Sequence, residues 1–309
     1  MQSLTVSILR RIFAYSDLET LLLACRPASS TFATAVDEEL KDRMKGLIGW
    51  SVLSYELTYL LSRHCRFAAD VEEMRNAMRA SHAFIGGSLP LRMFSPIKFI
   101  PSNADIFVPI SGAAVLIQHL STHEGYRVES ANNISPIAMP NDPQHDTAVV
   151  TYGAGLQSIT VMRQPGKTVN VHTFPNPHPF VFAADVITLS WTTLLFNFVT
   201  ADYAICAYPE LSLKGRGLFH MERFLRGMPG GSSNHILNEY ADRGFDFAGH
   251  PSWWFARDYD ACSKGSTCPL SRRTFGDGGC LIIPSREGPG DAFGRDWIFG
   301  GVTDSVHDM

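Results

Sequence analysis

Apolar side chains recur at helical spacing through the first part of the chain. A single helix stripe is formed by Leu4, Ile8, Ile12 and Tyr15. Asp17 stands where it can cap a second helix that begins near Leu18. Few glycines or prolines interrupt residues 35–80. The pattern therefore predicts an all-helical unit over residues 1–80.

The pattern changes near residue 82, where short apolar runs alternate with glycine, proline and asparagine. Strands are predicted in the runs HAFIGG, ADIFVPI and YAICAY, and on both sides of the Pro-Gly-Lys turn in QSITVMRQPGKTVNVHTF. Helices are predicted over 88–94, over 111–125 with Ser111 as cap and Gly125 as stop, and over 183–199, 218–226 and 233–243. This order indicates an α+β protein with a mixed sheet and flanking helices.

The same pattern sets the remaining boundaries of the chain. The predicted sheet domain and its C-terminal extension span 81–284, and the Gly-, Pro- and Asp-rich tail 285–309 is predicted to be flexible. The most apolar long stretch, 180–199, contains Asp185 and Asn197. We expect it to be a buried helix and not a membrane span.

Composition and charge narrow the classes of partner. The 309 residues are 45% hydrophobic, which is enough to bury a sizeable core, and the formal net charge is −4. This balance lacks the basic excess typical of proteins that bind nucleic acids or anionic membranes, so neither partner is expected. No signal peptide is recognised, and six cysteines in a chain of this length do not indicate a disulfide framework. We expect a reducing compartment, the cytosol or the nucleus.

The N-terminal run SLTVSILRRIFAYSDLETLLLACRPASSTF resembles an F-box. The positions that match the motif in order are Leu4, Ile8, Leu9, Ile12, Phe13, Tyr15 and Asp17, continued by Leu21, Cys25, Arg26, Ser29 and Phe32. Thr5, Ser7 and Ser16 depart from it. The resemblance implies that Leu4, Ile8, Leu9, Ile12 and Phe13 dock an adaptor of cullin-type ubiquitin ligases. The alternative is that the apolar stripe only packs onto the rest of the protein.

A Gly-Ser turn and an acid on the following strand form the second candidate site. A nucleotidyltransferase uses such a turn to hold phosphates, two acids at i and i+2 to bind Mg²⁺, and a third acid on a later strand. Gly86-Gly87-Ser88 occupies the turn here, and SNADIFV resembles the acid-bearing strand. Asp105 is then the second acid, while Asn103 stands at the first position and Asn170 at the third.

Two of the three carboxylates are therefore amides. An amide oxygen remains a ligand but brings no charge and cannot act as a base. The alternatives are an ordinary tight turn, or the replacement of the missing acids by Asp146 or Asp185. The run LSWTTLLFNFVTADYAICAYPELSLKGRGLF resembles the segment after such a core in uncharacterised fungal proteins that join an F-box-like N-terminus to a nucleotidyltransferase-like domain. That resemblance covers residues 4–282.

The cysteines suggest a structural zinc site. Its candidate ligands are Cys262, Cys268, Cys280 and His250. The wide spacing favours the alternative, buried free thiols or an adventitious disulfide.

Three functions follow from the sequence. The first is a non-catalytic interaction protein, an F-box-type substrate receptor that binds the ligase adaptor through its helices and a partner or a ligand through a degenerate core. The second is a Mg²⁺-dependent nucleotidyltransferase in which Asp105 is catalytic. The third is a pseudoenzyme that binds a nucleotide through Gly86, Gly87, Ser88, Asn103 and Asn170 without transferring it.

Overall fold

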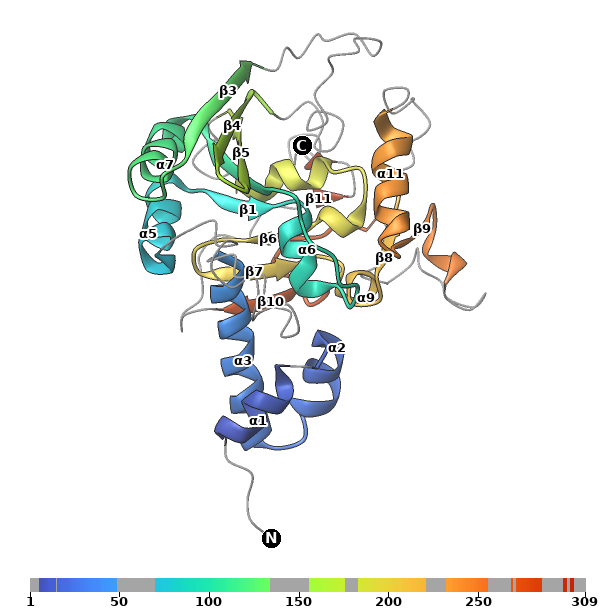
Figure 1. Cartoon of the computed structure of the whole chain (residues 1–309). Coiled ribbons are helices and arrows are strands. Elements are labelled where there is room, and N and C mark those ends of the chain that lie inside the picture. Colours follow the sequence, from blue (N-terminus) through green and yellow to red (C-terminus); the bar gives the residue numbers. More distant parts are fainter. Residues whose placement is uncertain are drawn as a thin grey trace, which may run out of the picture.

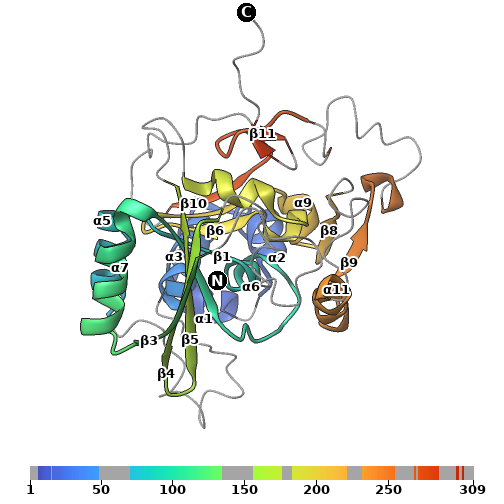
Figure 2. The same ribbon diagram turned by 90° about the horizontal axis from the view of Figure 1, so that it is seen from above.

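The fold is a mixed α+β arrangement, as the sequence predicts (Figure 1). The computed structural model describes residues 6–14, 16–48, 70–133, 156–175, 183–220, 232–254, 268, 271–284, 297–298 and 301–302. Helices near the N-terminus extend from one side of a large sheet, and α11 lies at the opposite margin of the molecule from α5 and α7 (Figures 1 and 2).

The described N-terminal region contains helices and no strands. It contains α1 (Val6–Phe13), α2 (Leu18–Thr20), the π-helical turn η1 (Leu21–Cys25), α3 (Ser30–Ile48) and α5 (Val71–Ser81). Asp17 caps α2, because its carboxylate accepts the backbone N–H of Thr20 at 2.7 Å. Arg43 on α3 donates to the carbonyls of Phe13 and Ser16 at 2.9 and 2.8 Å, which satisfies the open end of α1.

Eight strands of the described chain form one mixed sheet in the order β10-β7-β6-β1-β2-β5-β4-β3. Their bounds are β1 (Phe84–Gly86), β2 (Ala104–Pro109), β3 (Arg127–Asn133), β4 (Ser158–Gln164), β5 (Lys167–Phe174), β6 (Asn197–Val199), β7 (Tyr203–Cys206) and β10 (Leu281–Pro284). The pairing of β2 with β5 is parallel, and the other pairings recorded in this sheet are antiparallel.

The two faces of the sheet belong to different apolar clusters. Along β2, Ala104, Ile106 and Val108 face the cluster that also contains residues of α1, α3, α5 and α7. Phe107 faces the opposite cluster, with Phe84 stacked on it at a centroid distance of 5.1 Å. Alternation along the strand therefore turns Asp105 toward the same face as Phe107.

The remaining elements cover the sheet and its margins. They are α6 (Ser88–Phe94), α7 (Ile110–Thr122), α9 (Pro209–Ser212), α11 (Ser232–Asp242), the 3₁₀ turns η3 (Ala183–Leu189), η4 (Thr193–Leu195) and η5 (Pro251–Trp253), and the strands β8 (Arg216–Leu218), β9 (Asp246–Ala248), β11 (Trp297–Ile298) and β12 (Gly301–Val302). Strands β8 and β9 pair in parallel, and β11 pairs with β12 in antiparallel fashion.

The prediction of a single helix over 183–199 is wrong. The segment forms η3, η4 and β6 instead. Its buried hydroxyl groups make local or distant hydrogen bonds that compete with a helix. The Thr192 hydroxyl accepts the N–H of Leu194, and Thr193 accepts the N–H of Leu218 at 2.9 Å.

Smaller differences concern three other predictions. The helix predicted from Ser111 begins one residue earlier with Pro109 as its cap, so Ser111 lies inside α7. The start of the helix predicted over 218–226 belongs to β8, and 221–231 lie outside the described residues. Within the tail 285–309, the described residues form the β11–β12 pair.

Candidate functional site

The candidate site lies on β2 and on the two strands that pair with it, β1 and β5. Gly86 is the register partner of Asp105 across the β1–β2 pair. Asn170 is the register partner of Asp105 across the parallel β2–β5 pair. The sheet therefore brings together the Gly-Ser turn, the acid and the amide that the sequence analysis aligned with a nucleotidyltransferase site.

The Asp105 carboxylate is the centre of a hydrogen-bond cluster. One of its oxygens, Oδ1, accepts Asn103 Nδ2 at 2.7 Å and Asn170 Nδ2 at 3.0 Å. His172 Nε2 lies 3.0 Å from the same oxygen. A carboxylate only accepts, so both amides present their NH₂ groups and the imidazole carries its proton on Nε2.

His172 is a member of this cluster that the sequence analysis missed. Its side chain is 1% exposed, and its ring stacks on Phe107 at a centroid distance of 4.7 Å. The available signal was its position two residues after Asn170, since residues at i and i+2 of a strand share a face.

The Gly-Ser turn is shaped by close packing. A Cβ atom on Gly86 would lie 2.7 Å from Cε2 of Phe107, so the position requires glycine. Gly87 has φ of 71°, the left-handed region that favours glycine, and it directly precedes α6. Ser88, the first residue of that seven-residue helix, is partly exposed.

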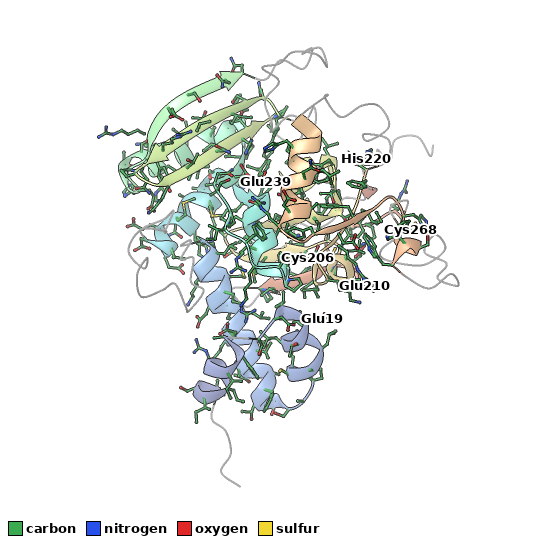
Figure 3. The ribbon with its side chains drawn as sticks, turned by 45° about the vertical axis from the view of Figure 1, so that its right-hand side comes forward. Glu19, Cys206, Glu210, His220, Glu239 and Cys268 are labelled. Atoms are coloured by element: carbon green, nitrogen blue, oxygen red, sulfur yellow. The ribbon has the colours of Figure 1, made fainter. Side chains whose placement is uncertain are left out.

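The α11 helix lies within electrostatic reach of Asp105. Burial raises the pKa of the Tyr240 phenol, Arg243 lowers it, and the negative charge of Asp105 raises it again. Arg243 stacks over Phe99 and Tyr240 at 5.0 and 5.1 Å and forms an ion pair with Glu239. Figure 3 labels Glu239 on this helix.

The donor set of the site does not fit the two Mg²⁺ ions of a nucleotidyltransferase. Two of the three aligned groups are neutral amides that turn their nitrogens toward Asp105. In the described part of the chain, no three His, Cys, Asp or Glu side chains are grouped to hold a metal. Asp146 lies outside the described residues, and Asp185 falls in η3 with its side chain undescribed.

The predicted zinc ligands do not form a described site either. Cys262 lies outside the described residues, and Cys268 is buried on the side of the molecule away from β3 and β4 (Figure 3). Burial raises the pKa of the Cys280 thiol to about 12. His250 is exposed, and its Nδ1 lies 2.7 Å from the Ser252 hydroxyl.

The predicted adaptor-binding residues divide into two groups. Leu9 and Phe13 are buried in the core and 2% and 3% exposed, so they cannot form part of an open docking face. Ile8 and Ile12 are 47% and 51% exposed on the same helix. Leu4 lies outside the described residues.

Comparison with known proteins adds no relative, because no family model, curated protein or solved structure matches this chain. None of the helices in the described ranges combines the length and the apolar character needed to span a membrane.

Proposed function

We propose that this chain is a non-catalytic interaction protein, in which an F-box-like helical segment is joined to a degenerate nucleotidyltransferase-like core. The observation that carries the proposal is the Asp105 cluster. One oxygen of its carboxylate receives donors from Asn103, Asn170 and His172, and the two amides stand where transfer chemistry uses further carboxylates. Losing one electrostatic contact of this kind costs a rate factor of about 10²–10³, so the loss of two leaves little activity.

The arrangement of the strands supports the nucleotidyltransferase-like part of this proposal. The turn at Gly86 and the amide of Asn170 lie on opposite sides of Asp105, on the two strands that pair with β2. Such a site needs a turn, an acid-bearing strand and a later strand in this relation.

The exposed apolar side chains of the helical segment support the interaction role. Ile8 and Ile12 lie at i and i+4 of α1, and Leu23 on η1 is 68% exposed. An isolated exposed apolar residue is ordinary, but three on one small helical unit provide anchors for an apolar partner. We propose that this partner is the adaptor of a cullin-type ubiquitin ligase.

The test is co-purification of the full chain with that adaptor. Ile12→Asp is expected to reduce capture at least about tenfold, because a charge is then forced into an apolar interface. The matched control is Val115→Asp, since Val115 is 45% exposed but lies on α7. Absence of capture by the wild-type chain, or equal capture by the Ile12 variant, would contradict the adaptor role.

A second candidate is nucleotide binding without transfer. It is favoured by the partly exposed Ser88 beside a turn whose glycine pairs with Asp105. Calorimetry with ATP and Mg²⁺ separates the candidates. Heat of binding that disappears in Ser88→Ala supports a nucleotide-binding pseudoenzyme. Incorporation of labelled nucleotide that Asp105→Ala abolishes would instead support an active nucleotidyltransferase.

A further inference from the structure

The atoms of the Asp105 cluster that remain open are hydrogen-bond acceptors. The three donors all reach Oδ1 of Asp105, and the Asn170 amide turns its nitrogen to that oxygen. The other oxygens, Asn170 Oδ1 and Asp105 Oδ2, therefore take no part in these three hydrogen bonds. Within the described chain no group donates to either oxygen. A ligand that fits these two atoms must supply N–H or O–H donors.

The carboxylate of Asp105 also lacks an arginine or lysine partner in the described part of the chain. No arginine or lysine of the described chain forms an ion pair with Asp105, whose side chain is 15% exposed. Arg243, which directly follows α11 and stacks over Tyr240, has Glu239 as its own counter-ion. A partly buried carboxylate without an arginine or lysine partner favours a cationic ligand over a phosphate, which would meet like charge.

The geometry points to a guanidinium group. The two acceptors come from register-paired residues of neighbouring strands, and a guanidinium presents two parallel N–H donors in one plane. An ammonium group is a point charge with a tightly held hydration shell, so it gains less from a site that water reaches only in part.

We propose that the Asp105–Asn170 pair binds the arginine side chain of a partner protein. This inference rests on the proposed non-catalytic role of the core, since a metal-binding core would present the same carboxylate to Mg²⁺. It assigns the site a ligand of opposite charge to the nucleotide of a working nucleotidyltransferase.

The test uses the full-length chain and N-acetyl-arginine amide as the probe. Its neutral counterpart of nearly equal shape, N-acetyl-citrulline amide, is the matched ligand. Binding is followed by calorimetry and by the ¹⁵N resonances of the His172 imidazole, which contacts Asp105 directly. Saturable binding of the arginine probe with a shift of those resonances is expected. The citrulline probe is expected to bind at least about tenfold more weakly, because charge-assisted hydrogen bonds are lost.

Two variants locate the site. Asp105→Asn is expected to weaken arginine binding at least about tenfold, and Asp242→Asn, which removes an equal charge from an exposed position of α11, is expected to leave it unchanged. If Asp105→Asn does not fold, Asn170→Leu removes the other acceptor at similar volume and serves the same purpose.

Equal binding of the two probes, undiminished binding in both site variants, or absence of binding would each overturn the proposal. These results leave adaptor capture by the helical segment unaffected, so failure of the arginine site and failure of the adaptor role are separate outcomes. Asp105-dependent binding of Mg²⁺–ATP would instead overturn both the arginine site and the non-catalytic core.

Discussion

At the scale of single residues, one oxygen atom of Asp105 on β2 binds Asn103, which directly precedes that strand, and two residues of β5. His172, on β5, is buried, whereas Asn103 and Asn170 are partly exposed. A buried N–H that loses its acceptor costs more than the hydrogen bond contributes when it is made. The carboxylate therefore matters for stability as well as for ligand binding.

Asp105→Ala is expected to lower the free energy of unfolding by about 2–3 kcal/mol, because the His172 N–H is left buried without its acceptor. Urea unfolding with linear extrapolation measures the change. The matched control is Asp242→Ala on the exposed side of α11, where a change within about 0.5 kcal/mol is expected. Equal losses in the two variants would contradict the role of the cluster.

The combined substitution Asn103→Asp and Asn170→Asp tests whether amides replaced metal ligands. Three crowded carboxylates should destabilise the metal-free variant, since like charges at close range repel. Millimolar Mg²⁺ should restore its melting temperature by binding only the folded state. Thermal unfolding with and without Mg²⁺ measures this, with the wild-type chain as the control. A wild-type response of equal size would show that the natural donor set already binds the ion.

At the scale of elements, the sequence pattern predicted helices and strands correctly where interactions between residues close in sequence decide the structure. The run SLPLRMF predicted a short helix, and α6 spans Ser88–Phe94. The Pro-Gly-Lys turn predicted the β4–β5 pair. The pattern failed over 183–199, because the hydroxyl of Thr193 binds the N–H of Leu218 and that partner is distant in sequence. His172 was missed as a site residue for the same reason, since its acceptor lies on another strand.

The loop before β10 depends on an ion pair at the same scale. Arg273 donates to Asp277 Oδ1 at 2.7 Å and to the Ala207 carbonyl at 3.1 Å, which ties the loop to the end of β7. Burial raises the pKa of Asp277, but the hydrogen bond and charge of Arg273, with the N–H groups of Gly279 and Thr274, bring the pKa below its ordinary value of 3.8.

This lowered pKa predicts the sign of a pH dependence. The folded state favours the Asp277 carboxylate, so its stabilisation is complete above the ordinary pKa and is lost as the pH falls through the lower pKa of the folded state. Asp277→Asn should therefore be less stable than the wild-type chain at neutral pH, and the difference should narrow below about pH 4. Urea unfolding across that range measures it. A difference that widens as the pH falls would contradict the assignment.

At the scale of the whole molecule, the change of composition near residue 82 is not a break in the apolar core. The helix α5 ends at Ser81 and the first strand follows at Phe84. One buried cluster nevertheless includes Leu9 of α1, Met44 of α3 and Ile106 of β2. The helical segment and the sheet therefore share packing, even though the sequence pattern separates them into 1–80 and 81–284.

Shared packing predicts that both regions lose stability together. Met44 is fully buried, so Met44→Ala should cost about 2–5 kcal/mol through lost contacts and the cavity left behind. Hydrogen exchange followed by mass spectrometry measures the loss of stability separately in peptides from α3 and β2, under conditions where exchange requires global opening. Equal losses in both are expected, and the control Lys45→Ala, at an exposed position of the same helix, should change neither. A loss confined to α3 would mean that the helical segment opens independently of the sheet, and the predicted boundary near residue 80 would then also divide the molecule energetically.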